Sequence, residues 1–221
     1  YGALTLASLQ LGKLPGTAWL LLGAGLAVAA VELIQALRLG AAQRIPAIVF
    51  NYIVLPAALL GLAWWAAPLK PALTFQILLA LLLVVPLGPM VYRLAYQPLA
   101  GASVLVLLII SVAVHFAMTG LGLVFFGAEG SRTPPFSDVQ WKLGVLTVSG
   151  QSLWVIGTSL GLIVALLLFF EHTIYGKALR ATAINRIGAR LVGVSPAMAG
   201  KLSFTLAALI GALSGVLIAP I

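Results

Sequence analysis

The sequence lacks most of the side chains that catalysis, metal binding and disulfide bonding require. It contains no cysteine, which excludes disulfide bonds, thiolate chemistry and cysteine-ligated metals. Its only histidines are His115 and His172. The acidic residues are equally few: Glu32, Glu129, Asp138 and Glu171. Because a metal site needs several such ligands together and these are dispersed along the chain, we expect neither a metal nor another cofactor.

Motifs for nucleotide binding and hydrolysis are also missing. The phosphate-binding pattern G-x-x-x-x-G-K-[ST] does not occur, so ATP, if it drives this protein, must be bound by another subunit. A Ser-His-Asp hydrolase would need an acid beside His115, and only Glu32 lies deep enough in an apolar segment. A membrane enzyme should cluster its acids and histidines near one interface, which this sequence does not do. An enzyme or a structural scaffold is therefore a rival interpretation, but not the favoured one.

Charged residues are scarce and apolar residues abundant. Only 7% of the residues are charged and 62% are hydrophobic, whereas soluble domains are about 25% charged. Apolar runs that approach or exceed the roughly 20 residues needed to cross a bilayer occupy residues 14–37, 45–67, 73–92, 103–126, 153–170 and 202–220. They are continuous rather than alternating, which indicates helices and not barrel strands. The predicted fold class is an all-α, polytopic transmembrane bundle with six spans in this chain.

The basic residues are unevenly divided between the connections. The net charge is +8, from 12 Lys and Arg residues and 4 acids. If the spans alternate, eight bases share one side: Arg38, Arg44, Arg93, Lys177, Arg180, Arg186, Arg190 and Lys201. The other four are Lys13, Lys70, Arg132 and Lys142. The positive-inside rule then predicts that residues 173–201 are cytoplasmic and that residues 127–152 form an external loop. We attribute the charge to topology and to membrane lipid, and expect no nucleic acid partner.

A few polar residues within the spans are candidates for a translocation path. Polar groups are costly in hydrocarbon and usually face a protein interior or a watery path, so Glu32, His115 and Thr119 qualify. Alternatives remain open for each of them. Glu32 lies within about two helical turns of the cytoplasmic end and could pair locally or reach the interface. His115 and Thr119 share one helical face and could instead form a buried interhelical hydrogen bond.

Glycine pairs and prolines mark further features of the spans. Gly157 and Gly161, and likewise Gly211 and Gly215, are spaced so that another helix could approach closely, and they are predicted helix-packing residues. Generic packing explains such pairs as well as a specific partner does. Prolines predict irregularities in the second and third spans at Pro46, Pro56, Pro86 and Pro89.

The basic connection has helical periodicity but not the pattern of one helix. Apolar residues recur every four positions at Leu179, Ala183, Ile187 and Leu191. However, Arg186 and Arg190 fall within about 40° of Leu179 on a helical wheel, so one unbroken amphipathic helix fits poorly. We predict a break near Asn185, followed by a short helix held between protein surfaces. Gly193 is a predicted helix stop and Pro196 a predicted start of the next helix.

Three stretches resemble a known family. YGKALRATAINRIGARLVGVSPAMAGKLSFTLAALIGALSGVLIAPI, residues 175–221, resembles the permease subunits of ABC importers, specifically the branched-chain amino acid family with its related urea and amide permeases. YRLAYQPLAGAS, residues 92–103, and YGALTLAS at Tyr1 extend the resemblance. Complete members have further helices on both sides. The resemblance therefore implies that residues 1–221 are a fragment of a single transmembrane permease domain that lacks helices at both ends.

The resemblance also implies a loop that couples the permease to an ATPase. The general importer motif is EAA, three residues, then Gly, and the matching positions here are Ile187, Gly188, Ala189 and Gly193. The first two depart from the motif and the last two agree. Because the motif's glutamate is absent, we expect the ATPase contact to rest on the close fit of the small residues together with Arg186 and Arg190.

The function implied is ATP-driven import of branched-chain or related amino acids across a bacterial-type inner (plasma) membrane by alternating access. The implied partners are a second homologous permease subunit, two cytoplasmic ABC ATPase subunits at residues 173–201, and a soluble substrate-binding protein outside. No covalent chemistry is expected in this chain. The alternatives are a urea or amide ABC permease and an ion-gradient-driven secondary transporter. The latter should show internal duplication and charged, unwound midplane segments, and we find no convincing duplication.

Overall fold

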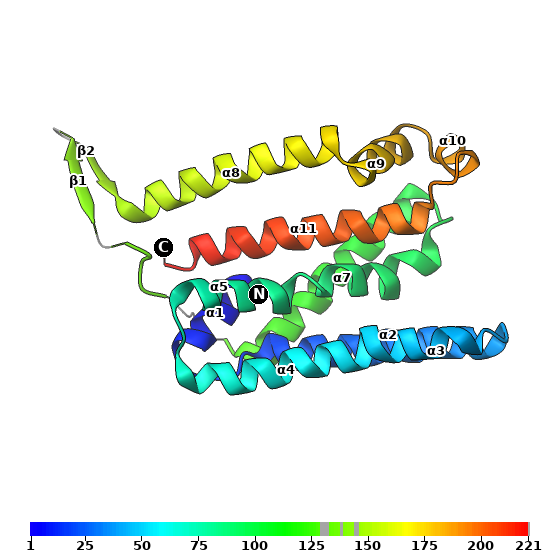
Figure 1. The fold of residues 1–221 in the computed structure, drawn as a ribbon, viewed down its shortest axis with the longest axis horizontal. Coiled ribbons are helices and arrows are strands. Elements are labelled where there is room, and N and C mark those ends of the chain that lie inside the picture. The colour runs from blue at the N-terminus through cyan, green and yellow to red at the C-terminus, as the bar shows by residue number, and fades with distance from the viewer. Residues whose placement is uncertain (129–132, 138, 144–145, 221) are drawn as a thin grey trace.

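The protein is a bundle of long helices (Figure 1). The computed structural model describes residues 1–128, 133–137, 139–143 and 146–220. Within that part, six helical segments are long and apolar enough to cross a membrane: α2 (Gly16–Arg38), Ala42–Leu69, Leu73–Leu99, α7 (Val104–Phe126), α8 (Gly150–His172) and α11 (Pro196–Ile218). The six predicted spans are confirmed, and with them the helical fold class.

Two spans extend by more than one helical turn beyond one end of their apolar runs. The third helical segment continues to Leu99 rather than ending near Tyr92, and the sixth begins at Pro196 rather than at Leu202. Both extensions lie at the same end of the bundle (Figure 1). The length of an apolar run reflects only the part of the helix inside the hydrocarbon. The helix itself continues until its backbone hydrogen bonding ends at a cap. Pro196 suits a helix start because its missing N–H would have no helical partner there.

The second span changes its helical geometry around a proline. It consists of η1 (Ala42–Arg44), α3 (Ile45–Val49), a π-helical turn η2 (Phe50–Val54), α4 (Leu55–Ala66) and η3 (Ala67–Leu69). Pro56 has no N–H to donate to the Tyr52 carbonyl four residues earlier, and the π turn ends just before it. The Tyr52 carbonyl oxygen lies so close to Gly25 of α2 that any Cβ at Gly25 would collide with it. The predicted irregularity therefore coincides with a close helix contact.

The third span is interrupted in a similar way. Its parts are α5 (Leu73–Val84), α6 (Leu87–Val91), a π turn η4 (Tyr92–Tyr96) and η5 (Gln97–Leu99). The α-helix is broken between α5 and α6 at Val85 and Pro86, in agreement with the predicted irregularity. The π turn η4 was not predicted. It widens the helix at Arg93, whose side chain reaches α2 as described below.

A short helix that no apolar run predicted lies in the core. α1 (Gly2–Gln10) has nine residues, too few to span a bilayer, and Leu6 and Leu9 on it are almost fully buried. It packs against α5 and α11. The Thr5 and Thr17 hydroxyls, both fully buried, are hydrogen-bonded at 2.8 Å and join α1 to α2. The main apolar core lies where α1, α2, α4, α5, α6 and α11 meet.

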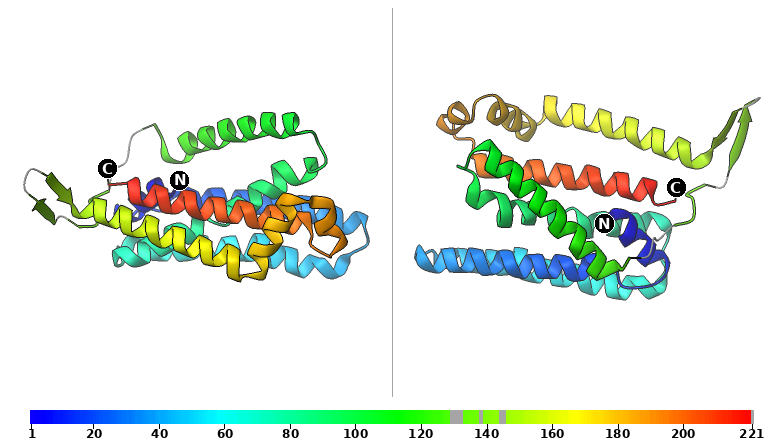
Figure 2. Two further views of the ribbon diagram at one scale, coloured as in Figure 1. Left: turned by 90° about the horizontal axis from the view of Figure 1, so that it is seen from above. Right: turned by 180° about the vertical axis from the view of Figure 1, so that it is seen from behind.

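Two of the long helices lie at the edge of the bundle (Figure 2). No residue of α7 is buried, and on α8 only Gly150 and Gln151 are. The Gln151 amide donates to the Leu217 carbonyl of α11 at 2.8 Å and so fixes the start of α8. Most of the surface of both helices is therefore free within this chain.

The connection between α7 and α8 contains an antiparallel hairpin of β1 (Gln140–Leu143) and β2 (Leu146–Ser149). It lies at the end of the bundle opposite the α8–α11 connection (Figure 1). The assignment of residues 127–152 as an external loop stays a prediction.

Candidate functional site

Two short helices, α9 (Ile174–Ile184) and α10 (Arg186–Leu191), join α8 to α11. Thr173 caps α9, because its hydroxyl accepts from the Gly176 N–H at 2.9 Å. Asn185 separates the two helices with an extended backbone, and its side-chain oxygen accepts from the Gly188 N–H at 2.9 Å. This arrangement confirms the predicted break near Asn185. One residue ends the first helix and caps the second, which sets the direction of α10.

The end of α10 is closed by a Schellman motif. The Val194 N–H donates to the Ala189 carbonyl at 2.9 Å and the Gly193 N–H to the Arg190 carbonyl at 3.1 Å. Gly193 has φ +88°, a conformation that costs other residues energy. The predicted helix stop at Gly193 is confirmed. Because only Val194 and Ser195 lie between Gly193 and Pro196, α10 and α11 are joined by a short, defined turn.

The two large apolar residues of α10 face away from this chain. Ile187 is 75% exposed and Leu191 84% exposed, whereas Leu179 of α9 is buried. The apolar ladder predicted from Leu179 to Leu191 therefore does not form one buried face, because the backbone turns at Asn185. α10 contacts its own chain through Ala189, which is 4% exposed. We expected α10 to be held between two protein surfaces. Within this chain only the side with Ala189 is covered by protein.

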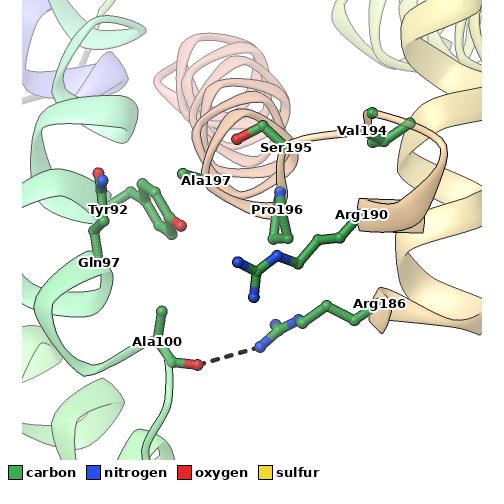
Figure 3. Close-up of a pocket in the computed structure, with 10 residues that line it drawn as sticks. Tyr92, Gln97, Ala100, Arg186, Arg190, Val194, Ser195, Pro196 and Ala197 are labelled. Carbon is green, nitrogen blue, oxygen red and sulfur yellow. Dashed lines mark hydrogen bonds between the residues drawn. The ribbon is translucent and has the colours of Figure 1, made fainter. Parts of the chain in front are cut away.

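The two arginines of α10 point into a cavity instead (Figure 3). The cavity has a volume of about 530 Å³ and lies between α10, the start of α11 and the turn around Gln97 and Ala100. Arg186 donates to the Ala100 carbonyl at 3.2 Å. These two guanidinium groups are thus directed towards the third span of their own chain.

Glu32 forms an ion pair inside the bundle. Its carboxylate lies 2.6 Å from the Arg93 guanidinium, which also donates to the Gln35 side-chain oxygen at 2.7 Å. The side chains of Arg93 and Glu32 are 10% and 22% exposed. The sequence suggested a local pairing for Glu32 as one alternative but identified no partner, and it counted Arg93 only among the topological charges. The pair joins α2 to the π turn of the third span.

His115 and Thr119 lie on the exposed surface of α7. The Thr119 hydroxyl donates to the His115 carbonyl of its own helix at 2.9 Å, so its hydrogen bond is local. The His115 ring lies 5.8 Å from the Phe116 ring, edge to face. Their role as path residues stays a prediction, since neither side chain faces the core of this chain.

Glycines pack the helices together, but mostly not the predicted ones. A Cβ at Gly157, Gly161 or Gly211 would meet open space, and one at Gly215 would come no closer than 3.3 Å to α1. Helix packing by these four residues therefore stays a prediction. For Gly157, Gly161 and Gly211 the packing partner would have to be another chain.

The tight crossings of α11 involve three glycines that the sequence did not single out. A Cβ at Gly88 would collide with the Phe204 carbonyl, one at Gly2 with the Ala212 carbonyl, and one at Gly200 with the Tyr92 ring. All of these crossings involve α11. In each crossing one glycine, on one of the two helices, makes the close approach possible, so no spacing pattern within one helix could reveal it.

Comparison with known proteins identifies the family. A family model described as branched-chain amino acid transport system / permease component matches residues 57–221, well over half of the chain. The chain belongs to this permease family. No curated protein and no solved structure matches it. The resemblance noted in the sequence is therefore confirmed, and the protein is a permease component of a transport system.

The match covers the region that contains this site. It includes the third span from Leu73, both short helices and α11, but not α1 or α2. The Glu32–Arg93 pair consequently joins an unmatched helix of the permease to a matched one.

The structure also shows where the positions that resemble the importer motif lie, although their role in coupling stays a prediction. Ile187 is exposed on α10, and Gly188 donates to the Asn185 cap. A Cβ at Gly188 would approach the Asn185 side chain to 3.0 Å, so Asn185 and Gly188 suit one another.

Proposed function

We propose that this permease is the transmembrane subunit of an ATP-driven importer that moves branched-chain or related amino acids by alternating access. The observation that supports this most is α10, a short helix capped at both ends with an unpartnered apolar surface. It lies at the end of the bundle where α2 ends and α11 begins (Figure 1). We take this end, with residues 173–201, to be cytoplasmic because eight of the twelve bases belong to it.

The ATPase docks on the apolar surface of α10. Ile187, Leu191 and Val192 are each at least 75% exposed. Burying one such side chain contributes about 1.5–3 kcal/mol, so three of them can anchor a partner without the glutamate of the general motif. Arg186 and Arg190 play a smaller part in this contact than the sequence suggested, since they point into the cavity described above.

Movement of the ATPase reaches the spans through the turn at Gly193. The two capped ends make α10 rigid, and the buried Ala189 holds it against the chain. Val194 is hydrogen-bonded back to Ala189, so displacement of α10 displaces the start of α11. α11 contacts α1 and α6 through the tight glycine crossings and passes the motion to the core. Alternating access is then a rearrangement of packed helices.

The remaining partners use surfaces that this chain leaves open. A second homologous permease pairs through α7 and α8, whose surfaces are almost wholly unburied. His115 and Thr119 on α7 are then candidates for a solute path between the two permeases, and Gly157 and Gly161 on α8 for the packing. The soluble binding protein docks at the opposite end, which carries residues 127–152. Two cytoplasmic ATPases complete the importer.

The ion pair of Glu32 with Arg93 favours coupling of transport to ATP rather than to an ion gradient. A secondary transporter needs an acid that can gain and lose its ion during transport. Glu32 is instead held by Arg93 at 2.6 Å. Urea and short amides remain alternative substrates within the same family pattern, and a binding assay on the partner binding protein distinguishes them.

Co-purification tests the docking surface. We expect Ile187→Asp and Leu191→Asp each to abolish retention of ATPase subunits by the affinity-purified permease, because a carboxylate cannot be buried in an apolar contact. Leu39→Asp is the matched control, since Leu39 is 79% exposed at the same end of the bundle but lies outside α10. Equal ATPase retention by all three variants would refute the assignment.

A further inference from the structure

The cavity beside α10 is strongly basic. Arg186 and Arg190 both point into it (Figure 3), and none of the residues that line it is acidic. Arg186 uses part of its guanidinium for the Ala100 carbonyl, and the Arg190 guanidinium has no ion pair or hydrogen bond to the described residues. Since each guanidinium carries five N–H donors, most of their hydrogen-bonding capacity is free to bind an anion.

Other polar groups in the same cavity are also without partners. Ser195 precedes α11 but its side chain does not cap the helix, so the first N–H groups of this 23-residue helix lack a side-chain acceptor. The Gln97 side-chain oxygen is buried and has no hydrogen-bond partner among the described residues. Free helix N–H groups attract negative charge, and a buried amide oxygen needs a hydroxyl or ammonium donor. Together with the arginines, these groups fit an anion that also carries a donor.

The basic cavity continues into an apolar one. A second cavity of about 310 Å³ shares Tyr92, Ala100 and Arg186 with the first. Its further lining is mainly apolar and includes Leu107 and Phe204. A third cavity of about 410 Å³ lies beside it along α8, α9 and α11, and Ser203 lines both. Its lining is mainly apolar, with Arg180 as its charged member. The three cavities therefore run from a basic mouth at the helix ends to an apolar groove along the spans.

We infer that this groove binds an anionic phospholipid, with its phosphate between Arg186 and Arg190 and an acyl chain along α11. The basic mouth accounts for a phosphate, since arginine binds phosphate with paired hydrogen bonds. The Gln97 oxygen accepts from a headgroup hydroxyl or ammonium. A free phosphate would leave the apolar groove empty, and a zwitterionic lipid would leave the arginines only partly neutralised. The lipid links the short helices to the third span at the position where α10 joins α11.

The test is lipid retention by the intact permease complex. The complex is purified from nanodiscs that contain equal amounts of phosphatidylglycerol and phosphatidylcholine, and bound lipid is counted by native mass spectrometry. We expect retention of phosphatidylglycerol over phosphatidylcholine. Arg186→Gln and Arg190→Gln should each lower it about five- to tenfold. Arg38→Gln, which removes an exposed base at the same end outside the cavity, should leave retention unchanged.

A second arm separates a lipid from a free anion. Ser203 is exposed, so Ser203→Phe fills the apolar groove without disturbing the core. It should lower phosphatidylglycerol retention severalfold, and 10 mM inorganic phosphate should not displace the lipid. Displacement by phosphate together with an unaffected Ser203→Phe variant would show a free-anion site and overturn the lipid assignment.

Two further results would also overturn it. If Arg38→Gln lost as much bound phosphatidylglycerol as the two cavity variants, general surface charge and not this groove would retain the lipid. Lipid bound to the permease alone but absent once the ATPase is attached would mean that acidic groups of the ATPase occupy the arginines. Because the readout is bound lipid and not uptake, failure of the docking surface on Ile187 and Leu191 would leave this test unaffected.

Discussion

The ion pair between Glu32 and Arg93 gives the sharpest test of how the bundle is held together. Replacing Arg93 by Gln removes the 2.6 Å ion pair and the 2.7 Å hydrogen bond to Gln35, and leaves the Glu32 carboxylate within the bundle without its cation. Fully buried pairs lose about 3–5 kcal/mol when one partner is removed, and exposed pairs about 0–1 kcal/mol. With the two side chains 10% and 22% exposed, we expect a loss of about 2 kcal/mol.

A double-mutant cycle isolates the pair. Arg93→Gln, Glu32→Gln and the double variant are purified in detergent, and thermal unfolding is followed by tryptophan fluorescence. Each single variant should unfold about 4–8 °C lower. The double variant should lose less than the sum of the two, because it leaves no unpaired charge. Arg38→Gln is the matched control and should unfold like the wild type. Additive losses, or an unchanged midpoint in Arg93→Gln, would refute the view that this pair joins α2 to the third span.

Three further predictions follow from the helix contacts. Gly88→Val should sharply reduce the yield of folded permease in size-exclusion chromatography, because its side chain would meet the α11 backbone, whereas Gly61→Val, at a glycine with open space around it, should fold normally; equal yields would contradict this. Gly193→Val should strain the turn after α10 by about 1–2 kcal/mol and allow ATP hydrolysis without solute uptake. Normal uptake in vesicles would count against transmission of movement from α10 to α11 through this turn. Thr5→Val should cost about 1–3 kcal/mol in thermal unfolding by leaving the buried Thr17 hydroxyl unpaired, and a wild-type midpoint would argue against that bond.

Much of the fold could be predicted because its signals are local. A continuous apolar run is enough to predict a spanning helix, since hydrocarbon requires the backbone to satisfy its own hydrogen bonds. The break at Asn185 and the stop at Gly193 were predictable for a related reason. A capping amide and a residue that tolerates positive φ act on groups only a few positions away.

The connection between α8 and α11 was predictable only in part. Its two-helix form followed from the sequence, but the ladder through Ile187 and Leu191 suggested burial, and both side chains are exposed. A repeat of four residues places side chains on one face only while the helix is unbroken, and the turn at Asn185 ends that relation. The same turn sends Arg186 and Arg190 towards the third span.

The sequence by itself determined the number of spans, the helical class, the family and the two ends of α10, because hydrophobic length, capping and motif letters are properties of short segments. Only the tertiary structure decided the partner of Glu32, the glycines at the helix crossings and the cavity that receives the arginines. Arg93 lies far along the chain from Glu32, and Gly88 meets α11 across the bundle. Such contacts depend on how whole helices are placed against one another, which no local pattern records.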